Sequence, residues 1–452
     1  MMPTLPLAHW LTSPRPNETP IAWLGDHIWT LGQLRHDVAH LVAALQQQDG
    51  VRWALCAENS YLFLVALLAT LHAGKTPVIP GHSRESLLNE QRTLFDGVLS
   101  DRPLDGCGPV QVVTSSGKSV AGVQPLPAID PHSHVELFTS GSTGHPQRIV
   151  KPIASLDCEA SLLAARFADR LAGCRVIGSV APLHLYGLTF RIFLPMSLGL
   201  PLHAAMIQYA EQLAALDSQQ RYAFISSPAF LKRLDDKLTP PPVEMLLSAG
   251  GMLPWQHAVQ TAAWLHVWPD EIYGSTETGV LAWRHRQHDD AAWQPFPGVQ
   301  ITAEGEHFRA ISPLIPAENG LLLDDVLHFN QDGTFQLTGR RGRVVKIEEK
   351  RISLNEIEQR LRDLDGVCDA AALAVTRNGR QSVGALLVLD AVTREKWQHN
   401  AGALELSWRS ALRPWLEPVA VPRYWRIIEE IPVNSMNKRV YAHLQELFHE
   451  TA

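Results

Sequence analysis

Residues Phe138–Val150 read FTSGSTGHPQRIV and indicate a loop that binds phosphate. Four hydroxyl side chains and two glycines fall in six positions, namely Thr139, Ser140, Gly141, Ser142, Thr143 and Gly144. Backbone N–H groups that glycine leaves accessible, together with hydroxyls, can surround phosphate oxygens. The segment is not a Walker loop, because the spacing GxxxxGK[ST] does not occur in it. Taken alone, the segment also fits an ordinary Ser/Gly turn.

Helices and short apolar strands alternate on both sides of this segment, which predicts an α/β fold with a largely parallel sheet. Residues 23–53 contain a short strand and then a long helix, for which Thr30 is the expected N-cap. Tyr61–Gly74 is shorter than the roughly 20 residues that a membrane helix needs, so a buried helix is expected there. Further strands are expected at Arg175–Val180, Tyr222–Ile225, Met245–Leu247 and His266–Trp268.

From Val299 the sequence changes to short strands with turn signals, which predicts a small β subdomain with a hairpin at Asp332–Gly333. A helix follows whose start has the capping-box residues Ser353 and Glu356. The strands and helix after it predict a compact α+β domain of about 110 residues. We therefore expect a large N-terminal domain at 1–342 and a smaller, mobile C-terminal domain at 343–452.

The chain of 452 residues carries 39 Lys and Arg against 46 Asp and Glu, a net charge of −7. This mild acidity argues against nucleic acid or an anionic membrane as a partner. No signal peptide is expected, since no basic stretch followed by an apolar one opens the sequence. We expect a cytoplasmic protein without stable membrane insertion. The five cysteines are Cys56, Cys107, Cys158, Cys174 and Cys368, and none of them forms a CxxC pair. This spacing argues against a disulfide framework or a zinc site.

A second segment, Glu271–Gly279 (EIYGSTETG), follows an apolar run. The ring of Tyr273 can stack on a purine, and the hydroxyls can bind a phosphate. The carboxylate of Glu277 can bind Mg²⁺, a hard ion that prefers oxygen ligands. Taken alone, this segment also fits a turn with a solvated glutamate.

These two segments and four further motifs occur in the order that is typical of the AMP-forming adenylation family of acyl-CoA synthetases, carrier-protein ligases and luciferases, and the chain resembles that family. The motifs are FTSGSTGHP at 138–146, SAGG at 248–251, YGSTETG at 273–279, the acid of LLDDV at Asp325, GRRGRVVK with RI at 339–352, and PVNSMNK ending at Lys438. The resemblance covers residues 20–445. It implies that a carboxylate attacks the α-phosphate of ATP, which releases pyrophosphate and leaves an acyl-adenylate, and that a thiol then takes the acyl group.

The resemblance also implies a role for each motif. The β- and γ-phosphates of ATP are expected at Thr139, Ser140, Gly141, Ser142, Thr143 and Gly144. The adenine pocket is expected at Gly250, Gly251, Tyr273 and Gly274. The ribose is expected at Asp325, with Arg340 beside it. The α-phosphate is expected at Thr276, and Mg²⁺ is expected at Glu277.

Lys438 of the C-terminal domain is expected to bridge the substrate carboxylate and the α-phosphate, with Arg343 as the hinge about which that domain rotates. His184 corresponds to a family residue beside the substrate carboxylate, although a buried core histidine is an equal alternative. The acid pocket is expected to be lined by Leu185, Tyr186, Gly187 and Leu188.

The sequence departs from the family pattern at several positions. Gln147 stands where a lysine is usual, and Arg148 or Lys151 could supply the missing charge. At the hinge, Gly342 and Arg343 replace paired acids. Glu349 replaces a glycine near the path of the thiol arm, so thiol transfer is less firmly implied than adenylation. Asn437 replaces the glycine before the lysine, and asparagine tolerates a left-handed backbone.

The stretch VVKIEEKRISLNEIE resembles ligases that serve an acyl carrier protein in fatty acid or aryl polyene biosynthesis. From Arg343 onward, 16 basic residues stand against 15 acidic ones, which suits an acidic carrier protein. The expected substrate is an aryl or medium-chain acid, and a ligase that uses free CoA is the alternative acceptor class. A nucleotide-binding scaffold without turnover is a further alternative, motivated by Gln147, Gly342 and Glu349. A serine hydrolase is not indicated, because the GxSxG elbow is absent from the sequence.

Overall fold

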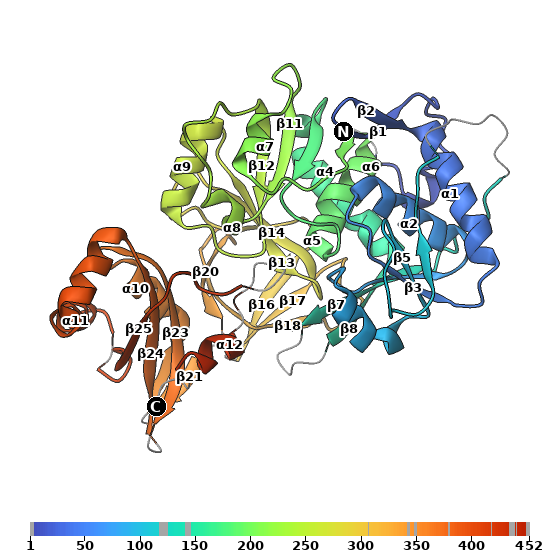
Figure 1. Ribbon diagram of the computed structural model, residues 1–452. Coiled ribbons are helices and arrows are strands. Elements are labelled where there is room, and N and C mark those ends of the chain that lie inside the picture. Colours follow the sequence, from blue (N-terminus) through green and yellow to red (C-terminus); the bar gives the residue numbers. More distant parts are fainter. Residues whose placement is uncertain are drawn as a thin grey trace. The chain divides into compact units, whose positions relative to one another are not determined.

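A nine-stranded, mainly parallel sheet is the largest element of the N-terminal part of the chain (Figure 1). The computed structural model describes residues 4–116, 125–140, 146–305, 307–340, 344–347, 350–377, 380–416, 418–433, 439 and 441–448. The strand order is β15 (Gln294–Pro295), β14 (Gly279–His285), β13 (Asp270–Ser275), β12 (Val243–Ser248), β11 (Tyr222–Ser226), β9 (Arg175–Gly178), β10 (Leu202–His203), β1 (Pro20–Leu24) and β2 (His27–Thr30). Only β2, β14 and β15 pair antiparallel with their neighbours in this sheet.

A second sheet of six strands belongs to the same part of the chain. Its order is β6 (Val110–Val112), β5 (Gly97–Ser100), β3 (Arg52–Leu55), β4 (Thr76–Ile79), β7 (His134–Ser140) and β8 (Pro146–Pro152). All pairs are parallel except β7 with β8, which form a hairpin. The two sheets confirm the α/β class expected from the sequence.

Helix α2 (Ser60–His72) lies between the two sheets, since it contacts β3 and β4 of one and β10 of the other. All its residues except Leu62 are buried. This placement explains why the helix is apolar on every face and confirms the expected buried helix. Helix α1 (Leu31–Gln46) begins at Thr30, whose side chain forms a capping box with Gln33, as the N-cap prediction required.

Helix α4 (Ile153–Leu171) follows β8 and packs against β12 and against η3 (Thr189–Phe193), a single stretch of π-helix. The other helices of this part are η1 (Leu7–His9), α3 (Glu85–Glu90), η2 (Arg92–Leu94), α5 (Leu185–Leu188), α6 (Leu194–Leu198), α7 (Ala210–Ala214), α8 (Pro228–Leu231) and α9 (Trp255–Leu265). The strand predicted at His266–Trp268 is wrong. His266 ends α9 in the left-handed conformation with φ 57°, and the strand begins after Pro269, at Asp270.

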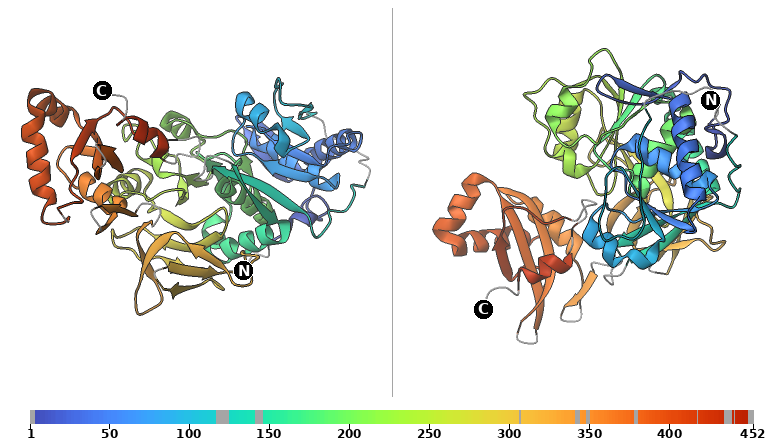
Figure 2. Two further views of the ribbon diagram at one scale, coloured as in Figure 1. Left: turned by 90° about the horizontal axis from the view of Figure 1, so that it is seen from below. Right: turned by 45° about the vertical axis from the view of Figure 1, so that its right-hand side comes forward.

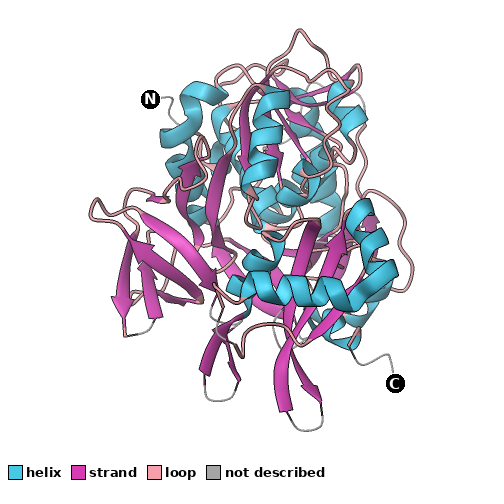
Figure 3. Cartoon of the chain, turned by 90° about the vertical axis from the view of Figure 1, so that its left-hand side faces the viewer, coloured by secondary structure: helices cyan, strands magenta, loops and turns pink. Residues whose placement is uncertain are grey.

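The C-terminal residues form a three-stranded sheet in the order β23 (Val367–Arg377), β24 (Arg380–Leu389) and β25 (Tyr424–Ile427). Helices α10 (Leu354–Arg362) and α11 (Ala391–Leu412) pack on one face of this sheet, and α12 (Tyr441–Glu446) packs on the other (Figures 1 and 3). Ser353 caps α10 by accepting from the backbone N–H of Glu356 at 3.2 Å. A smaller strand pair, β21 (Val344–Ile347) with β22 (Lys350–Ser353), precedes α10.

The predicted β subdomain is present as two small sheets, whose first strands are gold in Figure 2. They are β16 (Gln300–Glu304), β17 (His307–Ile311) and β18 (Leu321–Leu323), and the hairpin β19 (Asp325–Phe329) with β20 (Phe335–Arg340). Asp332 accepts from the backbone N–H of Thr334 at 3.0 Å in the expected turn.

The chain divides into two compact units, Met1–Gln300 with Ile311–Gly320 and Ile301–Ala310 with Leu321–Ala452. This division groups most of the β subdomain with the C-terminal residues, whereas the sequence placed it in the N-terminal domain. The boundary expected at Arg343 lies outside the described residues and stays a prediction.

Candidate functional site

The phosphate-loop motif forms the hairpin of β7 and β8. Thr139 pairs with Gln147 and Ser140 with Pro146, so the first two residues of the motif end strand β7. Thr139 is partly buried. The rest of the predicted loop lies outside the described residues, namely Gly141, Ser142, Thr143 and Gly144. Phosphate binding by this loop therefore stays a prediction.

The two basic residues after the loop have different surroundings. The side chain of Arg148 is 52% exposed, and its Nη2 lies 3.3 Å from Oε1 of the buried Glu136. Lys151 is 3% exposed, and its Nζ donates to the backbone carbonyl of Glu277 at 3.0 Å. Because Lys151 is buried and bound to a carbonyl, the suggestion that it supplies the charge missing at Gln147 is wrong, and Arg148 is the candidate that remains.

The motif YGSTETG forms the end of β13 and the turn into β14, where Ser275 pairs with Gly279. A Cβ atom on Gly274 would lie 2.2 Å from the carbonyl oxygen of Gly279, so only glycine fits there. Gly279 has φ +68°, which also favours glycine. Thr278 Oγ1 accepts from the N–H of Ser275 at 3.0 Å, and Ser275 Oγ accepts from the N–H of Thr278 at 3.2 Å.

These bonds close the turn and place Thr276 and Glu277 at its partly exposed tip. A hydroxyl and a carboxylate are thus side by side on a rigid support, as a site for a phosphate and its cation requires. The roles predicted for Thr276 and Glu277 are chemically possible here and stay predictions.

The motif SAGG follows strand β12, at the carboxyl edge of the parallel strands, where ligands of α/β sheets bind. Gly250 and Gly251 are exposed, and a Cβ atom on Gly250 would meet no atom within 4 Å. The φ of Gly250, +89°, favours glycine. An exposed backbone surface of this kind has room for a planar base.

Tyr273, at the end of the neighbouring strand β13, is held from one side by aromatic contact. Its ring centroid lies 5.8 Å from that of the buried Trp293. The guanidinium of Arg284 lies 4.4 Å from the centre of the Trp293 ring. A fixed ring beside the open glycines suits the adenine pocket expected from the sequence.

His184 immediately precedes helix α5 and is partly exposed, so it is not a fully buried core histidine. A Cβ atom on Gly81 would lie 3.6 Å from its ring, which places the imidazole against that turn. The expected pocket lining differs from the structure. Leu185 and Leu188 are buried in the main hydrophobic core, and Tyr186 donates from its hydroxyl to the carbonyl of Ser226 at 3.0 Å.

In the second unit, Asp325 and Arg340 face each other as paired residues of the hairpin β19–β20. The sequence expectation that these two residues lie together therefore agrees with the register. Arg343 and Lys438 lie outside the described residues, and their roles stay predictions.

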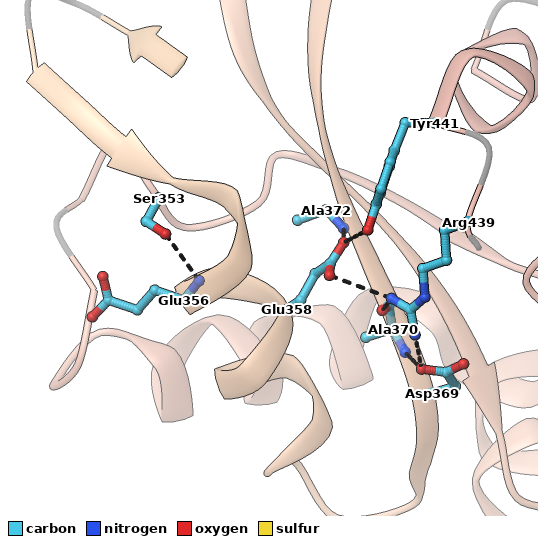
Figure 4. A network of polar contacts seen from close by, with 8 residues as sticks. All are labelled: Ser353, Glu356, Glu358, Asp369, Ala370, Ala372, Arg439 and Tyr441. Carbon is cyan, nitrogen blue, oxygen red and sulfur yellow. Dashed lines mark hydrogen bonds and ion pairs between the residues drawn. The ribbon is translucent and has the colours of Figure 1, made fainter. Parts of the chain in front are cut away.

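The residue after Lys438 is well fixed, as Figure 4 shows. The Nη1 of Arg439 lies 3.3 Å from Oε2 of the buried Glu358, and its Nη2 binds the carboxylate of Asp369. Glu358 also accepts from the backbone N–H of Ala372 at 2.8 Å. Arg439 further forms a bridge with Val433. Val433 and Arg439, the residues on either side of 434–438, are therefore paired with each other, and the side chain of Arg439 is fixed by Glu358 and Asp369.

Within the described residues, no three His, Cys, Asp or Glu side chains come together as a metal site. Among the same residues, no helix has both the length and the apolar character needed to cross a membrane.

Curated proteins with a similar sequence align with only part of this chain, and the chain aligns with only part of each of them. No protein-family profile matches it. N-benzoylphenylalaninol synthetase apmA of Penicillium brevicompactum is 23% identical over 431 residues, covering 81% of this chain and 18% of that protein. A 4-coumarate–CoA ligase of Halorhodospira halophila is 28% identical over 325 residues, covering 68% of this chain and 75% of that protein. The chain thus spans less than a fifth of the first relative and three quarters of the second.

Solved structures of the same fold cover almost the whole chain. ATP-bound MatB from Rhodopseudomonas palustris has a TM-score of 0.81 at 18% identity, with 98% of this chain and 99% of that chain covered. O-succinylbenzoate Coenzyme A synthetase (MenE) from Bacillus subtilis, in complex with AMP, has a TM-score of 0.80 at 16% identity, with 98% of both chains covered. The fold with a large N-terminal and a smaller C-terminal domain agrees with these structures.

Proposed function

We propose that this chain is an ATP-dependent acid ligase of the AMP-forming adenylation family, and that it activates an aryl or medium-chain carboxylic acid as an acyl-adenylate. We further propose that it transfers the acyl group to the phosphopantetheine thiol of an acyl carrier protein.

The contact between Lys151 and Glu277 carries this proposal. Lys151 belongs to the phosphate-loop hairpin, and Glu277 belongs to a turn 126 residues later in the chain. The hydrogen bond between them therefore joins two segments that were assigned to ATP phosphates and to the metal on separate sequence grounds. A structural role for each segment alone would not require them to meet.

The described residues also suit a nucleotide. Gly250 and Gly251 present open backbone beside Tyr273, where adenine would pack. Asp325 would accept from the ribose hydroxyls, and Arg340 stands opposite it in the hairpin. Glu277 offers one carboxylate, and Mg²⁺ in nucleotide sites is usually held by one or two carboxylates together with substrate phosphates.

In this site the chain itself has to bring two anions together. Thr276 would position the α-phosphate, and Lys438 would bind oxygens of both the carboxylate and the α-phosphate. Negative charge spreads over these oxygens in the transition state, so a fixed cation stabilises it electrostatically. Mg²⁺ would supply further positive charge at the phosphates.

The test is acid-dependent exchange of labelled pyrophosphate into ATP, with aryl and fatty acids of graded length. We expect exchange with a subset of these acids and a loss of at least about 100-fold in Lys438→Ala, with ATP binding retained. Near-normal exchange in Lys438→Ala would contradict the role of the lysine. Bound ATP without exchange for any acid would favour the scaffold without turnover.

Free CoA is the second candidate acceptor, because several similar proteins are named as CoA ligases. To separate the two, the enzyme loaded with acyl-adenylate is offered CoA or a phosphopantetheinylated carrier protein at equal concentration. Faster transfer to the carrier protein supports our proposal. Faster transfer to CoA makes the protein a CoA ligase.

A further inference from the structure

We propose that Lys151 and Glu159 are positioning residues that hold the Thr276–Val280 turn from its two sides. This inference rests on the proposed function, because it assigns these residues to the support of the same phosphate and metal site. Neither residue was recognised as a support of the turn from the sequence.

Each residue binds the backbone of the turn at a different point. Lys151 Nζ donates to the carbonyl of Glu277 at 3.0 Å. Glu159 Oε1 accepts from the backbone N–H of Val280 at 2.8 Å. The two bonded backbone groups flank Thr278 and Gly279, so the turn is fixed immediately after the residues assigned to the phosphate and the metal.

The carboxylate of Glu159 is itself held in place. Its Oε2 accepts from the hydroxyl of Thr189, in the π-helical stretch η3, at 2.8 Å. A Cβ atom on Gly279 would lie 2.8 Å from Oε1, so the carboxylate is in close contact with the turn. Glu159 therefore connects η3 to the turn through two short hydrogen bonds.

Burial shows that these are unusual choices of side chain. Lys151 and Glu159 are each 3% exposed, and charged groups are seldom buried unless they are compensated. Burial raises the pKa of Glu159 and lowers that of Lys151, and the opposite charge of each counteracts the shift of the other. A charged partner strengthens a hydrogen bond to a backbone group.

Their burial also separates them from the reacting groups. Thr276 and Glu277 are partly exposed at the tip, whereas Lys151 and Glu159 lie beneath the turn. They bind the backbone of the turn and so fix the position of the tip, which is the role of a supporting shell in a preorganised site, while the charge of Lys151 also acts on the nearby carboxylate of Glu277.

The experiment uses the full chain with Lys151→Met and Glu159→Gln, which keep most of the side-chain volume. Arg170→Met is the matched control, because Arg170 lies on the same helix as Glu159 but pairs with Asp270, at 2.6 Å. For each variant we measure thermal stability, the kcat and KM of acid-dependent exchange, and ATP affinity with and without Mg²⁺.

We expect both test variants to lose about 10- to 100-fold in kcat, as is typical when a supporting residue is removed. The gain in ATP affinity on adding Mg²⁺ should shrink in Lys151→Met and Glu159→Gln but not in Arg170→Met. A purely structural role predicts a loss of stability in all three variants with the Mg²⁺ gain unchanged, and that result would overturn the inference.

Hydrogen–deuterium exchange of a peptide covering 273–282 reports how firmly the turn is held and does not require the protein to be active. It therefore tests this inference separately from the proposed function. If the wild type shows no acid-dependent exchange, the proposed function fails. Faster deuterium uptake by this peptide in the two test variants than in the control would still support the holding of the turn. Equal uptake in all variants would contradict it.

Discussion

Glu271 Oε2 accepts a hydrogen bond from Nη1 of Arg286 at 2.6 Å, and both side chains are almost fully buried. Arg284 donates from Nε to the same oxygen at 2.8 Å. The pair also binds the backbone of Leu253 on both sides, since Glu271 accepts from its N–H at 3.2 Å and Arg286 donates to its carbonyl at 3.0 Å. Leu253 lies two residues after Gly251, the second of the two exposed glycines of SAGG, so this buried pair fixes one end of the proposed adenine loop.

Glu271→Gln should lower the free energy of unfolding by about 3–5 kcal/mol, because it removes the buried carboxylate that two buried guanidinium groups share and leaves Arg286 to pair with the exposed Asp289, at 3.6 Å. Urea denaturation measures this change. Glu429→Gln is the control, since Glu429 is 87% exposed in its pair with Arg394 and its loss should cost at most about 1 kcal/mol. Equal effects of the two substitutions would show that the buried pair contributes little.

Asp157 gives the protein a predictable dependence of stability on pH. Burial raises the pKa of Asp157 from 3.8 to about 6, against the effect of the hydrogen bond it accepts from the N–H of Leu7. Between these values the folded state holds a proton that the unfolded state has lost, so stability falls as pH rises from about 4 to about 6. At about 1.4 kcal/mol per pH unit, the full effect is at most about 3 kcal/mol.

Asp157→Asn should abolish this contribution, because the amide does not titrate while its oxygen can still accept from Leu7. The measured quantity is the difference in the free energy of unfolding between wild type and variant, from pH 4 to pH 7. We expect the wild type to lose stability relative to the variant over this range. A constant difference would mean that Asp157 titrates normally.

The structural features that could be predicted from the sequence are those that depend on residues close together in the chain. The N-cap at Thr30 and the turn at Asp332–Gly333 each involve a few consecutive residues, and both are confirmed. The strand predicted at His266–Trp268 failed because the apolar run did not reveal the left-handed conformation of His266.

The missed parts of the site are long-range contacts. The bond from Lys151 to Glu277 spans 126 residues, and no local pattern encodes it. Glu159 did leave a signal, because it lies among Leu156, Ala160 and Leu163 on the buried face of α4. A charged residue on an apolar helix face indicates a partner within the core.

Gly274→Ala should destabilise the hairpin β13–β14, because the new Cβ atom would lie 2.2 Å from the carbonyl oxygen of Gly279, and neither backbone can yield freely. We expect a loss of about 1–3 kcal/mol in the free energy of unfolding, together with reduced acid-dependent exchange. Gly251→Ala is the matched substitution for stability. Its Cβ atom would meet only Pro228, at 3.9 Å, so stability should change by less than about 0.5 kcal/mol.

Arg439→Met should reduce adenylation more than it reduces ATP binding. Arg439 adjoins Lys438 and is held by Glu358 and Asp369, so its loss frees one end of the segment that carries the lysine. We expect kcat for acid-dependent exchange to fall by about 10- to 100-fold, with the KM for ATP changed little. The control is Arg377→Met, because Arg377 stacks on Tyr424, 4.6 Å from its ring centre, instead of binding Glu358.

Loss of stability alone could also lower the rate, because Arg439→Met removes an ion-pair partner of the buried Glu358. The double substitution Arg439→Met with Glu358→Gln removes the buried carboxylate charge that lost this partner, and it should recover part of the stability. If Arg439 positions the lysine, kcat stays low in the double variant. Recovery of kcat along with stability would show that Arg439 acts only by neutralising Glu358.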